Sequence, residues 1–128
     1  MKLLLDTHIW IWLLQSPERL GSRAHQALAD KENELWVSPV STWEALMLHR
    51  KKRVELSSDC LAWLRHGTPG FQQAPFTHEI VLAAEQLNFH ADPADRFLAA
   101  TAQVLDLTLV TADQRLLGLG TFRTLSNR

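Results

Sequence analysis

The sequence predicts an α/β fold in which helices cover both faces of a central, mainly parallel sheet of four to five strands, giving three layers. Short apolar runs alternate with helical patterns along the chain, and strands separated by helices pair in parallel. The chain has 128 residues, of which 46% are hydrophobic. This size and composition suit one domain, residues 1–128, built around one core.

The N-terminal part predicts a strand, two helices and a second strand. Residues 2–5 form an apolar run typical of a buried strand, and a helical pattern follows over residues 8–15 until Pro17 stops it. Alanines and leucines at helical spacing predict a second helix over residues 22–31, and residues 35–37 form a short apolar strand. This order is that of a βαβ unit.

Capping signals predict the helices of the middle part. Ser41 and Glu44 have the S-x-x-E spacing of a capping box, which places Glu44 at the third position of a helix. A second helix is predicted to begin at a cap on Ser58 and to end at Gly67. Residues 71–75 have weak strand character.

The C-terminal part predicts two further helices and two strands. Thr77 can cap a helix with aliphatic residues at helical spacing. Asp92 and Pro93 open another, because aspartate suits the cap and proline suits the first helical position. The elements that follow are a strand over residues 107–110, a short turn of helix over residues 114–117 and an edge strand over residues 121–125.

Four acidic residues stand where the predicted chain changes direction. Asp6 and Asp113 follow the first and the last strongly apolar strands, and Glu44 and Asp95 stand in the first turns of helices. In open parallel sheets, ligand sites lie outside the carboxyl ends of the strands, where the helices also begin. We therefore expect the four carboxylates to converge, and they would repel one another unless a cation or protons neutralised them.

Each acid also fits an ordinary local role. Glu44 fits a capping box, Asp95 fits a first-turn acid that favours the helix dipole, and Asp6 and Asp113 fit turns. The joint pattern is what favours a metal site. Mg²⁺ or Mn²⁺ suits carboxylate and water ligands better than zinc does.

Composition limits the class of protein. Thirteen basic and 14 acidic residues give a net charge of -1, which excludes a globally basic nucleic-acid binder. The apolar run at residues 1–5 is too short for a signal peptide, and no stretch approaches the roughly 18 apolar residues of a membrane helix. Because Cys60 is the single cysteine, no internal disulfide can form. We expect a cytoplasmic protein with no membrane association.

The first predicted helix is apolar on every face over residues 9–14, which one small domain rarely buries completely. We therefore expect part of it to meet another protein. The chain also has five tryptophans and no tyrosine. These rings could stack RNA bases, but packing in the core or at a subunit contact is the favoured interpretation.

Four segments form a recognisable series: residues 4–8 with Trp12, residues 41–44, residues 90–102 and residues 109–113. Each motif is weak alone, but the four in this order with these flanks are specific. Together they resemble the PIN-domain ribonucleases, in particular the small toxins of bacterial VapBC-type toxin-antitoxin pairs, over nearly the whole chain. The resemblance implies a PIN-like, Rossmann-like version of the fold predicted above.

The resemblance also implies an activity, Mg²⁺- or Mn²⁺-dependent endonucleolytic hydrolysis of RNA phosphodiester bonds. Asp6, Glu44, Asp95 and Asp113 match the family's acidic metal-binding quartet. We assign Asp6 and Asp113 as direct ligands and Asp95 as a direct or water-mediated one. Glu44 either orients the attacking water or binds a second metal. The implied partners are RNA, an antitoxin whose C-terminal segment fills the active-site groove, and a second copy of the chain.

Three supporting residues join the quartet in the prediction. Thr111 matches a hydroxyl residue that supports the site in many family members, and Asp92 matches an additional acid of a His-x-Asp-Pro subgroup. Thr7 could donate a hydrogen bond to a substrate phosphate at the start of a helix.

Each of the other polar candidates has two possible interpretations. His8 and His90 could contact phosphate or move a proton, although a structural hydrogen bond is the favoured role. Arg96 could bind RNA phosphate or brace a carboxylate. The basic run at residues 49–53 could meet the RNA backbone, but a solvated helix end is the favoured interpretation.

Two other functions compete with the nuclease. A response-regulator receiver domain needs adjacent acids after its first strand and a lysine after its fifth, whereas this chain has Asp6 and Thr7 and no suitable lysine. A catalytically inert PIN-fold module that binds RNA or protein is the alternative, and the intact quartet argues against it. The RNA target, the antitoxin, the physiological metal, and a toxin or housekeeping role stay open.

Overall fold

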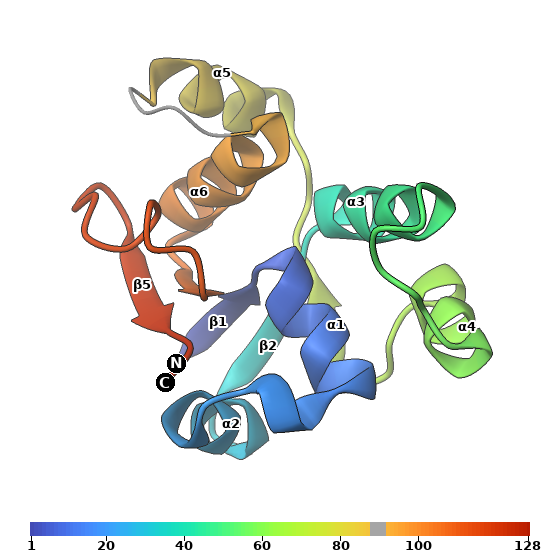
Figure 1. The fold of residues 1–128 in the computed structure, drawn as a ribbon. Helices are drawn as coiled ribbons and strands as arrows, with labels where there is room; N and C mark the ends of the chain where they lie inside the picture. The colour runs from blue at the N-terminus through green and yellow to red at the C-terminus, as the bar shows by residue number, and fades with distance from the viewer. Residues whose placement is uncertain (88–91) are drawn as a thin grey trace.

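The computed structural model describes residues 1–87 and 92–128. Within them, five strands form one parallel sheet in the order β3-β2-β1-β4-β5 (Figure 1). This confirms the predicted class and its parallel sheet. The strands are β1 (Lys2–Leu5), β2 (Glu34–Val37), β3 (Phe71–Gln73), β4 (Thr108–Thr111) and β5 (Arg123–Ser126).

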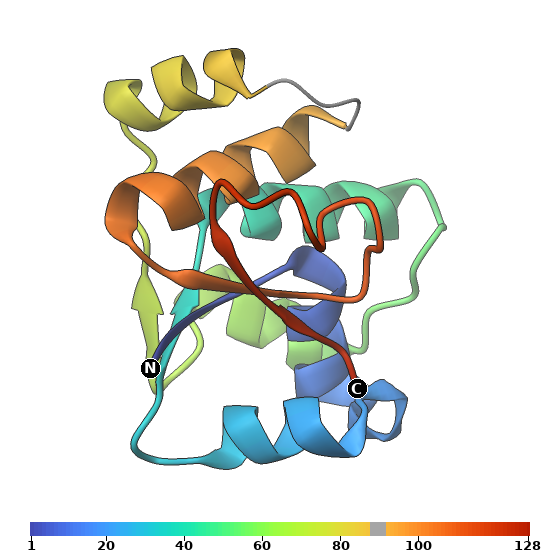
Figure 2. The same ribbon diagram turned by 90° about the vertical axis from the view of Figure 1, so that its left-hand side faces the viewer.

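Helices cover both faces of this sheet, as predicted. In Figures 1 and 2, α5 and α6 lie on the opposite side of the sheet from α2. The helices are α1 (Thr7–Gln15), the short 3-10 helix η1 (Pro17–Arg19), α2 (Ser22–Ala29), α3 (Pro39–Arg50), α4 (Ser58–His66), α5 (His78–Gln86) and α6 (Pro93–Leu105).

The two sides of β1 belong to two different cores, because successive side chains of a strand point to opposite faces. Leu3 and Leu5 pack with residues of α1 to α4, whereas Leu4 packs with Leu98 and other residues of α6. All three leucines are fully buried. A strand that is covered on both faces must be apolar throughout, which explains the uninterrupted run that marked β1 in the sequence.

Two predicted helix caps are wrong by one or three residues. Helix α3 begins at Pro39 because Ser38 accepts a hydrogen bond from the backbone N–H of Val40 at 3.0 Å, and proline suits the first helical position. Ser41 is therefore a buried residue inside the helix, and Glu44 is its sixth residue. Likewise, α4 is capped by Ser57, which accepts from Cys60 at 3.1 Å.

The predicted helical turn at residues 114–117 is also wrong. The segment after β4 folds into hydrogen-bonded turns in which the Asp113 carbonyl accepts from the Leu116 N–H at 3.1 Å. The Asp113 side chain accepts from the Arg115 N–H at 2.9 Å, and such side-chain bonds compete with helix formation. Gly118 then adopts a φ of 85°, so the segment does not continue as a helix.

The remaining elements agree with the prediction to within about two residues. Thr77 caps α5 by accepting from the Ile80 N–H at 3.3 Å. Asp92 occupies the cap of α6 and Pro93 its first position, although the Asp92 side chain makes no capping hydrogen bond. In the described residues, every helix is too short or too polar to cross a membrane.

Candidate functional site

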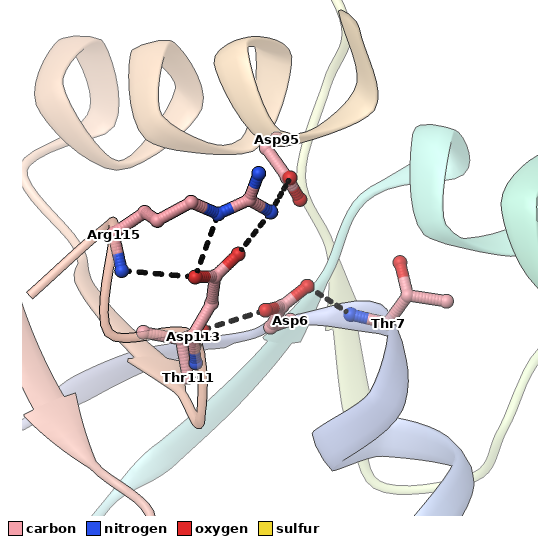
Figure 3. A network of polar contacts seen from close by, with 6 residues as sticks. All are labelled: Asp6, Thr7, Asp95, Thr111, Asp113 and Arg115. Atoms are coloured by element: carbon pink, nitrogen blue, oxygen red, sulfur yellow. Dashed lines mark hydrogen bonds and ion pairs between the residues drawn. The ribbon is translucent and has the colours of Figure 1, made fainter. Parts of the chain in front are cut away.

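Asp6 is the most tightly held acid of the predicted quartet. It directly follows β1 and caps α1, so its backbone N–H donates to Val110 while its side chain lies at the helix start. Its Oδ1 accepts from the Thr7 N–H and its Oδ2 from the Thr111 hydroxyl, both at 2.7 Å (Figure 3). The residue is only 7% exposed. Burial raises the pKa of Asp6, and the bonds from Thr111 and Thr7 oppose that rise.

Thr111 connects the acids of two neighbouring strands. It is the last residue of β4, which pairs with β1, and its side chain is fully buried. The hydroxyl that donates to Asp6 also accepts from the backbone N–H of Asp113 at 3.0 Å. The Thr111 hydroxyl therefore lies between Asp6 and Asp113 and bonds to both residues.

Asp113 is paired with an arginine that the sequence prediction did not include. The Nε of Arg115 donates to Oδ1 at 3.1 Å and its Nη2 donates to Oδ2 at 2.7 Å, in addition to the backbone bond. Figure 3 shows that the side chain of Arg115 extends from its turn and places the guanidinium between the carboxylates of Asp113 and Asp95. The side-chain hydrogen bonds from Arg115 lower the pKa of Asp113, so Asp113 is ionised at neutral pH.

Asp95 lies at the opposite rim of this cluster, at the third position of α6 as predicted. Its side chain is 13% exposed, and its Oδ2 lies 3.7 Å from Nη2 of Arg115. Burial and then the nearby negative charges raise its pKa to about 7. These charges are, in decreasing order of effect, Asp6, Glu44, Asp113 and Asp92.

Glu44 reaches the cluster from α3. It is half-buried, and its charge is among those that raise the pKa of Asp95, after burial and Asp6. Its carboxylate makes no hydrogen bond or ion pair with another residue in the described part of the chain. All four predicted acids thus lie within electrostatic reach of one point, although Glu44 arrives from the second turn of its helix and not from a capping box.

The donor set fits a hard divalent cation, because every candidate ligand is an oxygen and the buried Asp6 carboxylate accepts hydrogen bonds but makes no ion pair among the described residues. In their present rotamers, however, no three acidic, histidine or cysteine side chains of residues 1–87 and 92–128 are grouped closely enough to hold one ion. The Asp113 oxygens instead face Arg115.

Two of the secondary candidates have a different environment from the one predicted. Thr7 is fully buried, its N–H donates to Asp6, and its hydroxyl donates to Ser41 of α3 at 3.1 Å. Both donors are therefore used inside the protein. His8 is exposed, and its ring lies 6.0 Å from that of Trp12; the structural hydrogen bond favoured for it is not found among the described residues.

Arg96 contacts backbone carbonyls of the preceding helix. Its Nη2 donates to the carbonyls at the C-terminal end of α5, at 2.9 Å for Ala84, 3.2 Å for Leu87 and 3.3 Å for Glu85. The arginine thus caps one helix from the next, and within residues 1–87 and 92–128 it makes no hydrogen bond or ion pair with a carboxylate. His90 lies outside the described residues. The basic run closes α3, where the N–H groups of Lys51 and Lys52 donate to carbonyls of the last turn, in agreement with the favoured interpretation.

Arg115 is the functional candidate that sequence reasoning missed. Its signal was the spacing of Asp113 and Arg115, two residues apart after a buried strand. In the helix predicted for residues 114–117, residues two apart do not face each other. The turn that forms instead brings the two side chains together.

An apolar groove lies beside the acids, between the starts of α3 and α6. Trp43 is 59% exposed and Phe76 41% exposed. The groove is lined by Pro39, Val40, Trp43, Phe76, Pro93, Ala94 and Phe97. Trp43 is therefore neither a core residue nor fully covered by this chain.

Comparison with known proteins gives consistent relatives. The sequence model of the PIN domain matches residues 3–120. Ribonuclease VapC22 of Mycobacterium tuberculosis is 35% identical over 115 residues, which cover 88% of each protein.

Solved structures share the fold at low identity. VapBC2 from Rickettsia felis, bound to a DNA fragment from its promoter, has a TM-score of 0.72 at 16% identity and 98% coverage of both chains. DNA-bound VapBC from Salmonella typhimurium has a TM-score of 0.72 at 15% identity, covering 100% of this chain and 99% of that one. VapC20 of Mycobacterium tuberculosis, a sarcin-ricin loop cleaving toxin, reaches 0.67 at 16%, covering 92% and 95%.

Proposed function

This chain belongs to the PIN domain family, and from that premise we propose that it is a ribonuclease, the toxin of a VapBC-type toxin-antitoxin pair. The observation that carries the proposal is the convergence of Asp6, Glu44, Asp95 and Asp113 at the carboxyl edge of the sheet, in a relative of a ribonuclease. Residues 1–128 act as one PIN domain, and the cytoplasm, where RNA is translated, is its place of action.

The four acids are the proposed holders of Mg²⁺ or Mn²⁺, with Asp6 and Asp113 as direct ligands and Asp95 as a direct or water-mediated one. When bound, the cation supplies activation of a water and neutralises charge on the scissile phosphate. The protein contributes the positions: the Thr111 hydroxyl and the Thr7 N–H fix both oxygens of Asp6. Because the carboxylate is already oriented, no free energy is spent on reorienting it during the reaction.

Glu44 and Asp95 have different proposed roles. Glu44 makes no bond within the described residues, so its carboxylate is available to orient the attacking water or to hold a second cation. Asp95, whose pKa is about 7, must lose its proton before it can bind a cation. Asp92 stands exposed at the start of α6, where it adds negative charge to the same rim.

Two apolar surfaces support the proposed protein partners, a cognate antitoxin and a second copy of the chain. On α1, Ile9, Trp10 and Ile11 are buried, but Trp12 and its two following leucines are only half-buried. The groove around Trp43 is the second surface. Light scattering that shows a monomer at micromolar concentration, unchanged by added antitoxin, would contradict both partners.

The test of the activity is cleavage of total RNA by the purified chain, free of antitoxin, with Mg²⁺, Mn²⁺ or EDTA. The Asp6→Asn variant is run beside it, together with Asp59→Asn, which removes an exposed carboxylate from the start of α4. We expect discrete fragments with either metal from the wild type and from Asp59→Asn, and none with EDTA or from Asp6→Asn. Fragments that persist in Asp6→Asn would refute the assigned site.

A further inference from the structure

Arg115 occupies a position among the acids that the assigned roles do not explain. Its side chain is 60% exposed and extends from the turn after β4. The guanidinium binds both oxygens of Asp113 and lies 3.7 Å from Asp95. Asp113 and Asp95 are both proposed cation ligands, so the positive charge of Arg115 lies at the place where a bound cation would lie.

The present position of the guanidinium and a bound divalent cation exclude each other. Two positive ions that share the Asp113 carboxylate would lie a few ångströms apart and repel strongly. The Asp113 oxygens that a cation needs already accept hydrogen bonds from Nε and Nη2. In this arrangement, no three ligating groups among the described residues are gathered around one point.

A cation can compete for Asp113 because the Arg115 side chain is 60% exposed, and solvent screens its attraction to the carboxylate even though the bidentate geometry makes this pair stronger than most exposed ion pairs. The arginine is also anchored to a turn and not to the core, so its side chain can rotate without disturbing α6 or β4. Once displaced, its guanidinium stays tethered to the rim of the cluster. A guanidinium presents a planar set of donors that fits the oxygens of a phosphate.

We propose that Arg115 is a positioning residue that exchanges partners: it neutralises Asp113 and Asp95 in the cation-free protein, and on cation binding it moves to a phosphate of the RNA. The exchange couples loading of the cation to binding of the substrate. The RNA half of this inference rests on the proposed function, whereas the release from Asp113 requires only that the acids bind a cation.

The release is tested with the cation alone. Free Mn²⁺ is measured by electron paramagnetic resonance during titration of the wild type, Arg115→Gln and Arg115→Lys. Arg115→Gln should bind Mn²⁺ severalfold more tightly, because no guanidinium has to be displaced, and Arg115→Lys should lie nearer the wild type because the charge remains. If Arg115 served only to hold Asp113 in place, Arg115→Gln would bind more weakly. Weaker or unchanged binding overturns the proposal.

The movement itself can be followed by NMR of the arginine Nε–H groups in the wild type. The Arg115 signal, identified by its loss in Arg115→Lys, should shift on addition of Mg²⁺. Arg123 is an internal control, since its Nε donates to Thr108 and its Nη2 pairs with Asp106 at the other edge of the sheet. An Arg115 signal that stays fixed at saturating Mg²⁺ contradicts the exchange.

The phosphate contact is tested by kinetics at saturating Mn²⁺, where differences in cation affinity no longer matter. Arg115→Gln should raise the KM for RNA severalfold with a smaller effect on kcat, and Arg123→Gln should change neither. An unchanged KM would overturn the phosphate contact. If the wild type cleaved no RNA, the proposed function would fail, while the Mn²⁺ titration and the NMR shift would still decide the release of Arg115.

Discussion

The Thr111 hydroxyl lies 2.7 Å from Oδ2 of Asp6 and joins two residues that are 105 positions apart in the sequence. The Thr111 hydroxyl oxygen also accepts from the Asp113 N–H, so a single buried hydroxyl orients the acids that follow β1 and β4. Register makes this contact possible, because Leu5 pairs with Val110 in the parallel ladder. The residues after each strand therefore emerge side by side.

Replacing this hydroxyl should weaken both the fold and the cleavage reaction. Thr111→Val keeps the shape but leaves a buried Asp6 oxygen and the Asp113 N–H without a partner, which costs about 1–3 kcal/mol of unfolding free energy. Urea denaturation measures this loss, and cleavage of RNA should fall with it. Thr101→Val is the matched control, since that buried hydroxyl donates only to the Phe97 carbonyl of its own helix. Equal loss of cleavage in the two variants would contradict the role of Thr111.

Asp95 should make stability depend on pH in the absence of metal. Its folded-state pKa, raised to about 7 mainly by burial and also by neighbouring acids, lies above its ordinary value of 3.8. The protonated form therefore favours folding at low pH, and this contribution is lost as pH rises through 7. Asp95→Asn should be more stable than the wild type at pH 8 by about 1–2 kcal/mol, after allowance for solvent screening.

Urea denaturation in EDTA at pH 4 and at pH 8 checks this expectation. The advantage of Asp95→Asn should be largest at pH 8 and should become small near pH 4, where Asp95 is protonated in the folded chain and, at its ordinary pKa of 3.8, close to half protonated in the unfolded chain. Asp59→Asn, at an exposed site, should show no such trend. A variant less stable than the wild type at pH 8 would contradict the electrostatic account of Asp95.

Cation binding should release a proton near neutral pH. Because Asp95 is about half protonated at pH 7, a cation that takes this carboxylate must displace the proton. Mn²⁺ affinity should therefore fall as pH decreases below 7. Calorimetry in buffers of different ionisation enthalpy gives the number of protons released, and Asp95→Asn should release fewer. Equal proton release from the variant would place the titrating group elsewhere.

Arg96 should affect stability without affecting catalysis. Arg96→Lys retains the charge but cannot reproduce the bonds from one guanidinium nitrogen to three carbonyls at the C-terminal end of α5. We expect a loss of about 1–2 kcal/mol in urea denaturation, with cleavage unchanged at temperatures where the variant is folded. A selective loss of cleavage at full stability would restore the phosphate-binding role predicted from the sequence.

The parts of the fold that could be predicted from the sequence are those set by burial and local spacing. Leu3 to Leu5 form an apolar run because both faces of β1 are covered. Asp6 and Asp113 follow the apolar runs of β1 and β4, so their positions could be predicted from the sequence. Asp95 was placed correctly because Asp92 and Pro93 leave little freedom in where α6 begins. The convergence of the acids followed from these local signals and the direction of a parallel sheet.

The remaining features depend on contacts that no local pattern encodes. Both Ser38 and Ser41 are plausible caps for α3, and the choice follows from tertiary structure, since Ser41 is needed inside to accept a bond from Thr7. Arg96 acts on a helix end that precedes it in the chain, and Arg115 faces Asp113 only because residues 114–117 form turns. In each case the role of the residue depends on a partner in a different element or on a backbone conformation that the sequence pattern did not predict.

The distance along the chain between Asp6 and Thr111 has a consequence for synthesis. A ribosome makes Thr111 and Asp113 more than a hundred residues after Asp6. While the nascent chain lacks β4, the Asp6 carboxylate has neither its hydroxyl donor Thr111 nor its acidic neighbour Asp113. The proposed centre therefore assembles only after β4 has been translated and has paired with β1.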